Sequence, residues 1–178
     1  MKYALWTLAV IVGLVVIVVI IGALLPQKHA AARYISLHQK PDPVFALISD
    51  VQAGASWRPD VLAVDMLPDV DGHTRFRERM KHAAITMEVI ESRPPRRLVT
   101  FIADNKLPFG GIWIFDVTPT QDGCEVNITE GEVYNPVFRF VSRFVLGYNG
   151  TMDKYLRNLA HKFGENAQPQ DGTAGAQL

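Results

Sequence analysis

The chain of 178 residues is 48% hydrophobic, and its 18 lysine and arginine side chains balance its 18 aspartate and glutamate side chains. This neutral charge argues against a protein that holds nucleic acid by neutralising many phosphates, so we expect no nucleic-acid partner. The single cysteine, Cys124, excludes an intrachain disulfide and a metal site built from several cysteines. The length fits one ordinary domain behind an apolar N-terminal segment.

Residues 3–25 form an uncharged apolar run that is interrupted only by Thr7, Gly13 and Gly22. At about 1.5 Å per helical residue the run spans about 34 Å, which is enough to cross a hydrocarbon core of about 30 Å. It therefore predicts a single-pass transmembrane anchor within residues 1–25, with a bilayer as partner. A cleaved signal peptide is the main alternative, although its apolar region is usually only about 7–15 residues long. A buried core helix is disfavoured because the run is apolar on every side. Basic residues flank both ends, so the side of the membrane that holds the domain stays open.

The segments after the anchor predict an α+β domain with one long run of antiparallel strands. Residues 26–32 form a predicted tether, and residues 31–39 a first strand. Asp42, between two prolines, predicts a helix cap, followed by a short helix over 44–50 and a second short turn around 53–55. Turn residues then separate strand-like runs at short spacing, which we predict at 61–67, 73–81, 84–91, 97–103, 111–118 and 124–134. Because no long helical pattern lies between them, a parallel sheet with crossover helices is disfavoured.

The last predicted element is a long helix that is capped by Asn135, has Pro136 in its first turn and extends to residue 163. Apolar residues recur every three or four positions along it, which predicts one continuous apolar stripe. Gly147 and Gly150 interrupt this segment and predict a kink or a close approach. The polar segment 165–178 predicts a disordered tail, so the folded domain is expected to cover residues 33–164.

Four motifs carry a resemblance to a known superfamily. They are ASWRP at 55–59, ESRPPRRL at 91–98, LPFGG at 107–111 and GEVYNPVFRF at 131–140. With the order of the elements, they make residues 30–163 resemble the START-like superfamily, also called SRPBCC, which includes polyketide cyclase/dehydrase and lipid-transport members. The last two motifs look like a membrane-anchored subgroup of unknown function. The resemblance implies a helix-grip fold, in which a curved antiparallel sheet wraps around a long C-terminal helix and a hydrophobic cavity lies between them.

Many members of this superfamily bind lipids or other apolar molecules, and some are enzymes, so the resemblance implies a lipid or small hydrophobic molecule as partner. Alternation along the predicted strands indicates which side chains would face it. In the strand 73–81, one face carries Phe76, Glu78 and Met80. The other face carries a basic row of Arg75, Arg77, Arg79 and Lys81, which either meets anionic lipid head groups or is simply solvated.

The predicted ligand-binding set combines these strand residues with aromatic side chains of other elements. Trp113 and Phe115 are expected to meet Phe144 or Tyr148 of the last helix, although plain core packing is the alternative for each aromatic residue. The full set is Trp57, Phe76, Glu78, Met80, Trp113, Phe115, Phe144 and Tyr148.

Signals for catalysis are weaker. Glu78 in an apolar setting, or Asp116, would be a candidate acid or base, and the alternative for Glu78 is an ion pair with a basic residue such as Arg58. Glu130 and Glu132 share one strand face, but such pairs near a strand end usually face solvent. The five histidines show no metal-ligand spacing and no glycine-rich loop follows a strand and opens a helix, so we expect neither a metal nor a cofactor.

Three functions therefore remain open. The favoured one is a membrane-tethered protein that binds a lipid or a similar molecule without changing it, because no convincing catalytic constellation is present. The second is an enzyme of the cyclase or dehydratase kind that acts on a hydrophobic substrate. The third is a structural or partner-binding membrane protein whose core is filled.

Overall fold

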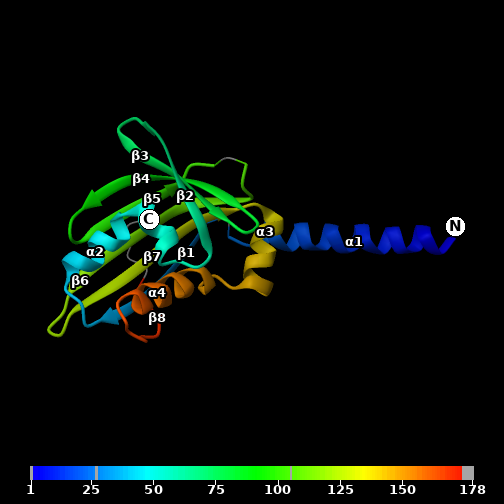
Figure 1. Cartoon of the computed structure of the whole chain (residues 1–178). Coiled ribbons are helices and arrows are strands. Elements are labelled where there is room, and N and C mark those ends of the chain that lie inside the picture. Colours follow the sequence, from blue (N-terminus) through cyan, green and yellow to red (C-terminus); the bar gives the residue numbers. More distant parts are fainter. Residues whose placement is uncertain (1, 27, 105, 174–178) are drawn as a thin grey trace.

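An apolar helix projects from a sheet-and-helix body in the computed structural model of the chain, which describes residues 2–26, 28–104 and 106–173 (Figure 1). This helix, α1 (Lys2–Leu24), is long and apolar enough to cross a membrane by length and composition. Nearly all of its side chains are exposed, and Gly22 is its buried residue. It is therefore not a core helix of the body, which was the third interpretation of this segment.

The body is built on an antiparallel sheet of eight strands in the order β2-β3-β4-β5-β6-β7-β1-β8. Strands β2 to β7 pair with their neighbours in the sequence, as the run of predicted strands implied, and β1 closes on β7. The bounds are β1 (Lys28–Leu37), β2 (Val61–Val70), β3 (His73–Met80), β4 (Ala84–Arg93), β5 (Arg97–Ile102), β6 (Phe109–Pro119), β7 (Cys124–Tyr134) and β8 (Gln170–Asp171).

The sheet curves around the C-terminal helix α4 (Gly150–Lys162), and the core lies between them (Figure 1). Along β7, alternate residues such as Cys124, Val126 and Ile128 point inward and are fully buried. They pack with an apolar face of α4 that includes Leu156 and Leu159. This sheet-around-helix arrangement is the helix-grip fold that we expected.

Two short helices, α2 (Pro41–Ser49) and η1 (Val51–Ser56), precede the strand run. The predicted cap at Asp42 was wrong: α2 begins at Pro41, and Asp42 lies in its first turn, where a negative charge favours the helix dipole. Asp50 instead caps η1, because its side chain accepts a hydrogen bond from the Ala53 amide at 3.1 Å.

The C-terminal helix is broken where we predicted one continuous element. It consists of α3 (Pro136–Val141), a π-helical turn η2 (Ser142–Leu146) and α4. The predicted cap is confirmed, since the Asn135 side chain accepts from the Phe138 amide at 2.8 Å. Gly147 has a φ of +74° and a ψ of 168°, a backbone conformation that is open almost only to glycine, and it ends the first half.

The predicted tether and tail both overlap with strands. β1 begins at Lys28, within the segment predicted as a tether, and β8 pairs with Arg33 and Tyr34 of β1. Arg33 also forms an ion pair with Asp153 at 2.6 Å and a second one with Asp171. The predicted disorder therefore does not extend to Gln170–Asp171, and residues 174–178 lie outside the described residues.

The two glycines at the break give a matched test of this geometry. We expect Gly147→Ala to lower the free energy of unfolding by about 1–3 kcal/mol, because alanine is strained at a positive φ. Gly150→Ala should raise it by up to about 1 kcal/mol, because Gly150 starts α4 at a negative φ with open space around its Cα. Urea unfolding of the full chain in detergent, followed by circular dichroism, measures both. Equal effects of the two substitutions would contradict a break at Gly147.

Candidate ligand-binding site

A cavity of about 530 Å³ lies between the concave face of the sheet and the helices η1 and α4. Strands β3 to β7 supply its floor, and Tyr148, Thr151 and Tyr155 lie on its helical side. A larger hollow of about 1080 Å³ is lined by Asp116 and Ile114. Because these residues alternate with the inward-facing Phe115 along β6, that hollow lies on the outer face of the sheet and is not the cavity of the helix-grip fold.

Tyr155 of α4 is the centre of an aromatic cluster in the cavity wall. Its ring centroid lies 5.1 Å from that of Trp57, 5.2 Å from that of Phe115 and 6.0 Å from that of Trp113. These are tilted and edge-on contacts of the kind that aromatic pairs prefer. Burial raises the pKa of the Tyr155 phenol, so this group stays protonated in the wall.

An ion pair between Arg58 and Glu78 lies in the cavity wall. Both side chains are buried, with exposed fractions of 13% and 7%, and the Arg58 guanidinium donates to Glu78 Oε1. Burial is the largest single influence and works against the charge of Arg58, but the interactions with Glu78, Tyr155 and Asp60 together outweigh it, and the pKa of Arg58 is raised. The guanidinium carbon also lies 5.3 Å from the ring centroid of Tyr155 and 5.7 Å from that of Trp57. The arginine partner that we offered as the alternative for Glu78 is therefore present.

Several buried polar atoms in the cavity wall have no hydrogen-bond partner among the described residues. They include Trp57 Nε1 and Thr100 Oγ1, whose residues are 8% and 4% exposed. An unpartnered buried donor costs about 1–3 kcal/mol, so the wall contains polar groups whose hydrogen-bonding capacity the described residues do not meet. The cavity is thus apolar with a few polar groups at fixed places, as small-molecule sites usually are.

The structure places most of the predicted ligand-binding set on the cavity wall. The residues that line it are Trp57, Phe76, Glu78, Met80, Trp113, Phe115 and Tyr148. Phe144 does not belong to this wall: it is 59% exposed and contacts Phe140, with 4.9 Å between the ring centroids. The prediction for Phe144 was wrong because it assumed one continuous helix through Gly147, which placed Phe144 on the helix face that contacts the sheet. Trp113 and Phe115 contact Tyr155 of α4.

The other predicted acid or base, Asp116, was assigned to the wrong face of the sheet. It lies on the outer face, where its Oδ1 accepts from Arg97 Nη1 at 2.8 Å. The basic row on β3 is likewise a surface feature that pairs along the sheet. Arg75 pairs with Glu88 at 3.3 Å, and Arg79 pairs with Asp65 at 3.0 Å.

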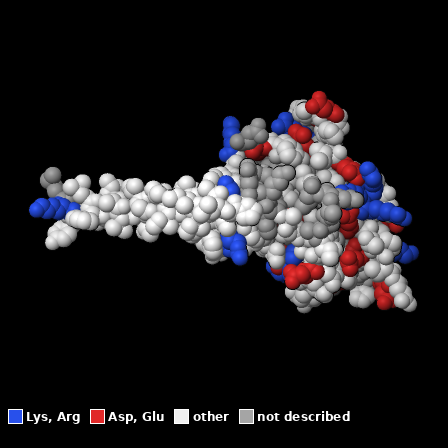
Figure 2. Space-filling view, turned by 180° about the vertical axis from the view of Figure 1, so that it is seen from behind, with Lys and Arg blue, Asp and Glu red and all other residues white. Residues whose placement is uncertain are grey.

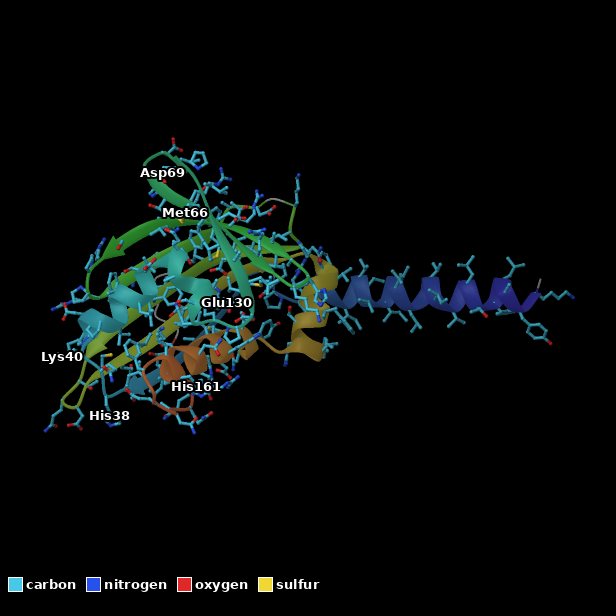
Figure 3. The ribbon with its side chains drawn as sticks, in the orientation of Figure 1. His38, Lys40, Met66, Asp69, Glu130 and His161 are labelled. Carbon is cyan, nitrogen blue, oxygen red and sulfur yellow. The ribbon has the colours of Figure 1, made fainter. Side chains whose placement is uncertain are left out.

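Sequence reasoning missed Glu130 as a cavity residue. It is 6% exposed and lines the cavity, and Figure 3 shows it in the interior between the sheet and the last helix. Its register partner across β6 and β7 is Trp113, and directly paired residues of antiparallel strands share a face. Alternation along β7 also places Glu130 inward, on the face of Val126 and Ile128, so the error was the assumption that a carboxylate near a strand end faces solvent. The side chain of Glu132 lies outside the described residues.

Other reactive groups do not gather at this site. Among the described residues there is no group of three or more His, Cys, Asp or Glu side chains that could hold a metal ion. Cys124 is fully buried in the core, and burial, with a smaller contribution from the charge of Glu165, raises the pKa of its thiol to about 11. The thiol therefore stays protonated and unreactive at neutral pH.

A curved antiparallel sheet around a C-terminal helix, with an aromatic-lined cavity between them, defines a helix-grip protein. The chain belongs to the polyketide cyclase/dehydrase and lipid transport family, whose model matches residues 30–164. No curated protein matches the chain by sequence.

Solved structures with the same fold are distant in sequence. The Zhui aromatase/cyclase from Streptomyces sp. R1128 is 12% identical with a TM-score of 0.62, over 76% of this chain and 93% of that one. Norcoclaurine synthase from Thalictrum flavum is 12% identical with a TM-score of 0.58, over 78% of this chain and 87% of that one. The di-domain ARO/CYC StfQ from the steffimycin biosynthetic pathway is 14% identical with a TM-score of 0.58, over 75% of this chain. The chain spans about half of that two-domain protein, 49%. These likenesses establish the fold.

The Arg58–Glu78 pair makes a specific prediction about stability. Arg58→Met leaves a buried carboxylate without its partner and should cost about 3–5 kcal/mol of unfolding free energy, whereas Arg58→Met with Glu78→Met should recover most of that loss. Urea unfolding of the full chain in detergent gives the values. The surface pair Arg79–Asp65 is the matched control, and Arg79→Met should change stability by less than about 1 kcal/mol. A double variant as unstable as Arg58→Met alone would show that the lost charge is not the cause.

Proposed function

We propose that the protein is a membrane-anchored binding protein for a small hydrophobic molecule that carries a polar group. The observation that carries this proposal is the cavity of about 530 Å³ with an aromatic wall and buried, unpartnered polar atoms. A filled core would need no such volume, and interiors without a ligand normally leave few voids larger than a water molecule. The third function, a partner-binding protein with a filled core, is therefore disfavoured.

The polar atoms of the wall specify what the ligand should offer. The Trp57 indole N–H can only donate, and the Thr100 hydroxyl can donate or accept, so a carbonyl, carboxyl or hydroxyl oxygen suits either group. Because both atoms are buried, a small side-chain rotation must first expose them to the cavity. The rest of the wall consists largely of apolar and aromatic side chains, such as Phe76, Ile102 and Trp113. We therefore expect a hydrocarbon or polyketide-like body with at least one oxygen.

Membrane anchoring by α1 is the second part of the proposal. The helix is uncharged after Lys2, and its large hydrophobic side chains are exposed, which in water would leave a very large apolar surface uncovered. Figure 2 shows this uncharged shaft with basic side chains at its two ends. Placement across a bilayer removes that surface from water.

The anchor predicts a retained N-terminus. The protein purified from membranes should have the intact mass of the full chain, and it should resist extraction at alkaline pH. Replacing Val15 and Ile17, two exposed residues of α1, with lysine should release it, because each charge at the bilayer centre costs about 3 kcal/mol. A mature chain that begins after residue 25 would establish the signal-peptide interpretation instead.

An enzyme of the cyclase or dehydratase kind is the second candidate, and one observation favours it. Glu78 is a carboxylate inside the cavity, and the family includes polyketide cyclases and dehydrases. Its ion pair with Arg58 weakens this candidate, because the carboxylate is already engaged. Mass spectrometry of the molecules recovered from the purified protein separates the two functions: a dehydratase would yield pairs of compounds that differ by one water, and a binding protein would not.

Cavity binding is tested by filling the cavity from β4. Ile85 lines the cavity, whereas Ile90 on the same strand is 39% exposed. Ile85→Trp should reduce binding of the fluorescent fatty acid cis-parinaric acid by at least about tenfold and lower the amount of co-purifying ligand, because the indole occupies the volume that the ligand needs. Ile90→Trp should change neither. If the two variants and the unmodified protein bound equally, or if none bound any apolar probe, the binding function would be wrong.

A further inference from the structure

The segment formed by α3 and η2, residues 136–146, lies across the inner end of α1 and does not continue its direction (Figure 1). The two are closely packed: a Cβ at Gly22 would lie 1.8 Å from the carbonyl oxygen of Pro136. Arg139 Nη1 also donates to the Leu25 carbonyl at 2.6 Å. The crossing segment is thereby fixed to the last turn of the apolar helix.

One face of the crossing segment is apolar and uncovered. Val137, Phe144 and Val145 are 45%, 59% and 70% exposed. Arg143 is also exposed, and its guanidinium carbon lies 5.8 Å from the ring centroid of Phe144. Exposed aliphatic and aromatic side chains beside an arginine are typical of helices that lie in a membrane interface.

The other face of the crossing segment closes the cavity. Phe138 and Ser142 line it, and Phe138 packs on Phe109 of β6 with 5.2 Å between the ring centroids. Gly147 and Tyr148, in the connection to α4, line the cavity as well. The same few residues therefore separate the cavity from whatever covers the exposed face.

We propose that this crossing segment lies on the surface of the bilayer that α1 crosses, and that the cavity exchanges its ligand with that bilayer across it. The inference rests on the anchoring part of the proposed function. Since α1 ends where the hydrocarbon core ends, a segment packed against its last turn lies at the level of the head groups. Phe144 and Val145 then enter the interface, and Arg143 reaches anionic lipid phosphates. A bilayer, unlike a second copy of the chain, is already next to this face wherever α1 is inserted.

The test uses the full chain in vesicles of phosphatidylcholine and phosphatidylglycerol. An environment-sensitive fluorophore is attached to a cysteine introduced by Phe144→Cys, and quenching by lipids with a nitroxide near the head group is measured. The buried Cys124 stays in place because its thiol is protonated and inaccessible. Val15→Cys in α1, quenched by a nitroxide deep in the bilayer, reports insertion of the helix. The matched control is Gln121→Cys in the turn between β6 and β7, which lies at the ends of these strands that are far from α3.

We expect strong quenching at positions 15 and 144 and none at 121, with a loss of about half the emission or more at 144. Quenching at 15 without quenching at 144 would overturn the inference and leave the anchor intact. No quenching at 15 would overturn the anchor, and with it the inference. Equal quenching at 144 and 121 would also overturn the inference, because the domain would then lie on the membrane without a preferred face. Self-quenching of the fluorophore at 144 alone would overturn it too, because this face would then contact a second copy of the chain.

Exchange with the bilayer has its own measurement. Phe144→Asp together with Val145→Asp should slow the transfer of cis-parinaric acid from vesicles to the cavity by about tenfold, because two charges oppose insertion of the segment. Binding of the probe delivered in detergent should stay unchanged, since neither residue lines the cavity. Gln121→Asp is the control. An unchanged transfer rate would overturn the proposed exchange route.

Discussion

The backbone conformation at Gly147 is the constraint on which both ends of the molecule depend. A helix that continued through this residue would extend α4 as one rod. Because glycine takes a φ of +74° there, α4 lies in the grip of the sheet while α3 and η2 turn toward α1. The same turn brings Phe138 and Tyr148 to the cavity. The connection that begins at Gly147 thus separates a helix that holds the core from a segment that closes the cavity.

The polar content of the cavity is concentrated at its aromatic centre. Arg58 lies over the rings of Trp57 and Tyr155 and is neutralised by Glu78, so the guanidinium is held in an apolar place without an unpaired charge. Among the described residues, the neutral Trp57 Nε1 and Thr100 Oγ1 of this wall have no hydrogen-bond partner, and neither does Arg58 Nε. A neutral or weakly polar ligand fits this site better than one that must bring its own charge into the cavity.

Alternation along each strand predicts which side chains face the cavity, and the helix break is what it cannot predict. Alternation placed Phe76 and Glu78 on one face because period two is a local property, and both are buried there. Applied consistently, it would also have placed Asp116 outward, opposite Phe115. It would likewise have placed Glu130 inward with Val126 and Ile128, in agreement with its pairing to Trp113, but a carboxylate near a strand end was assumed to face solvent. The helix break was only half predicted: the glycines were visible, but the apolar stripe continued through them, and a positive φ is not a property of the hydrophobic pattern.

The cavity has a direction, which follows from β6. Phe109, at the start of this strand, meets Phe138 beside α3, whereas Phe115, about 20 Å further along, meets Tyr155. The apolar aromatic contacts at the α3 end therefore lie toward α1, and the Arg58 and Trp57 groups lie with Tyr155, in the deeper half. A ligand whose oxygen is bound at the deep end must direct its hydrocarbon toward α3. For a molecule that enters the cavity from a bilayer at α3, the hydrocarbon is then the last part to leave the membrane. In this orientation the hydrocarbon loses the least contact with apolar surroundings during transfer.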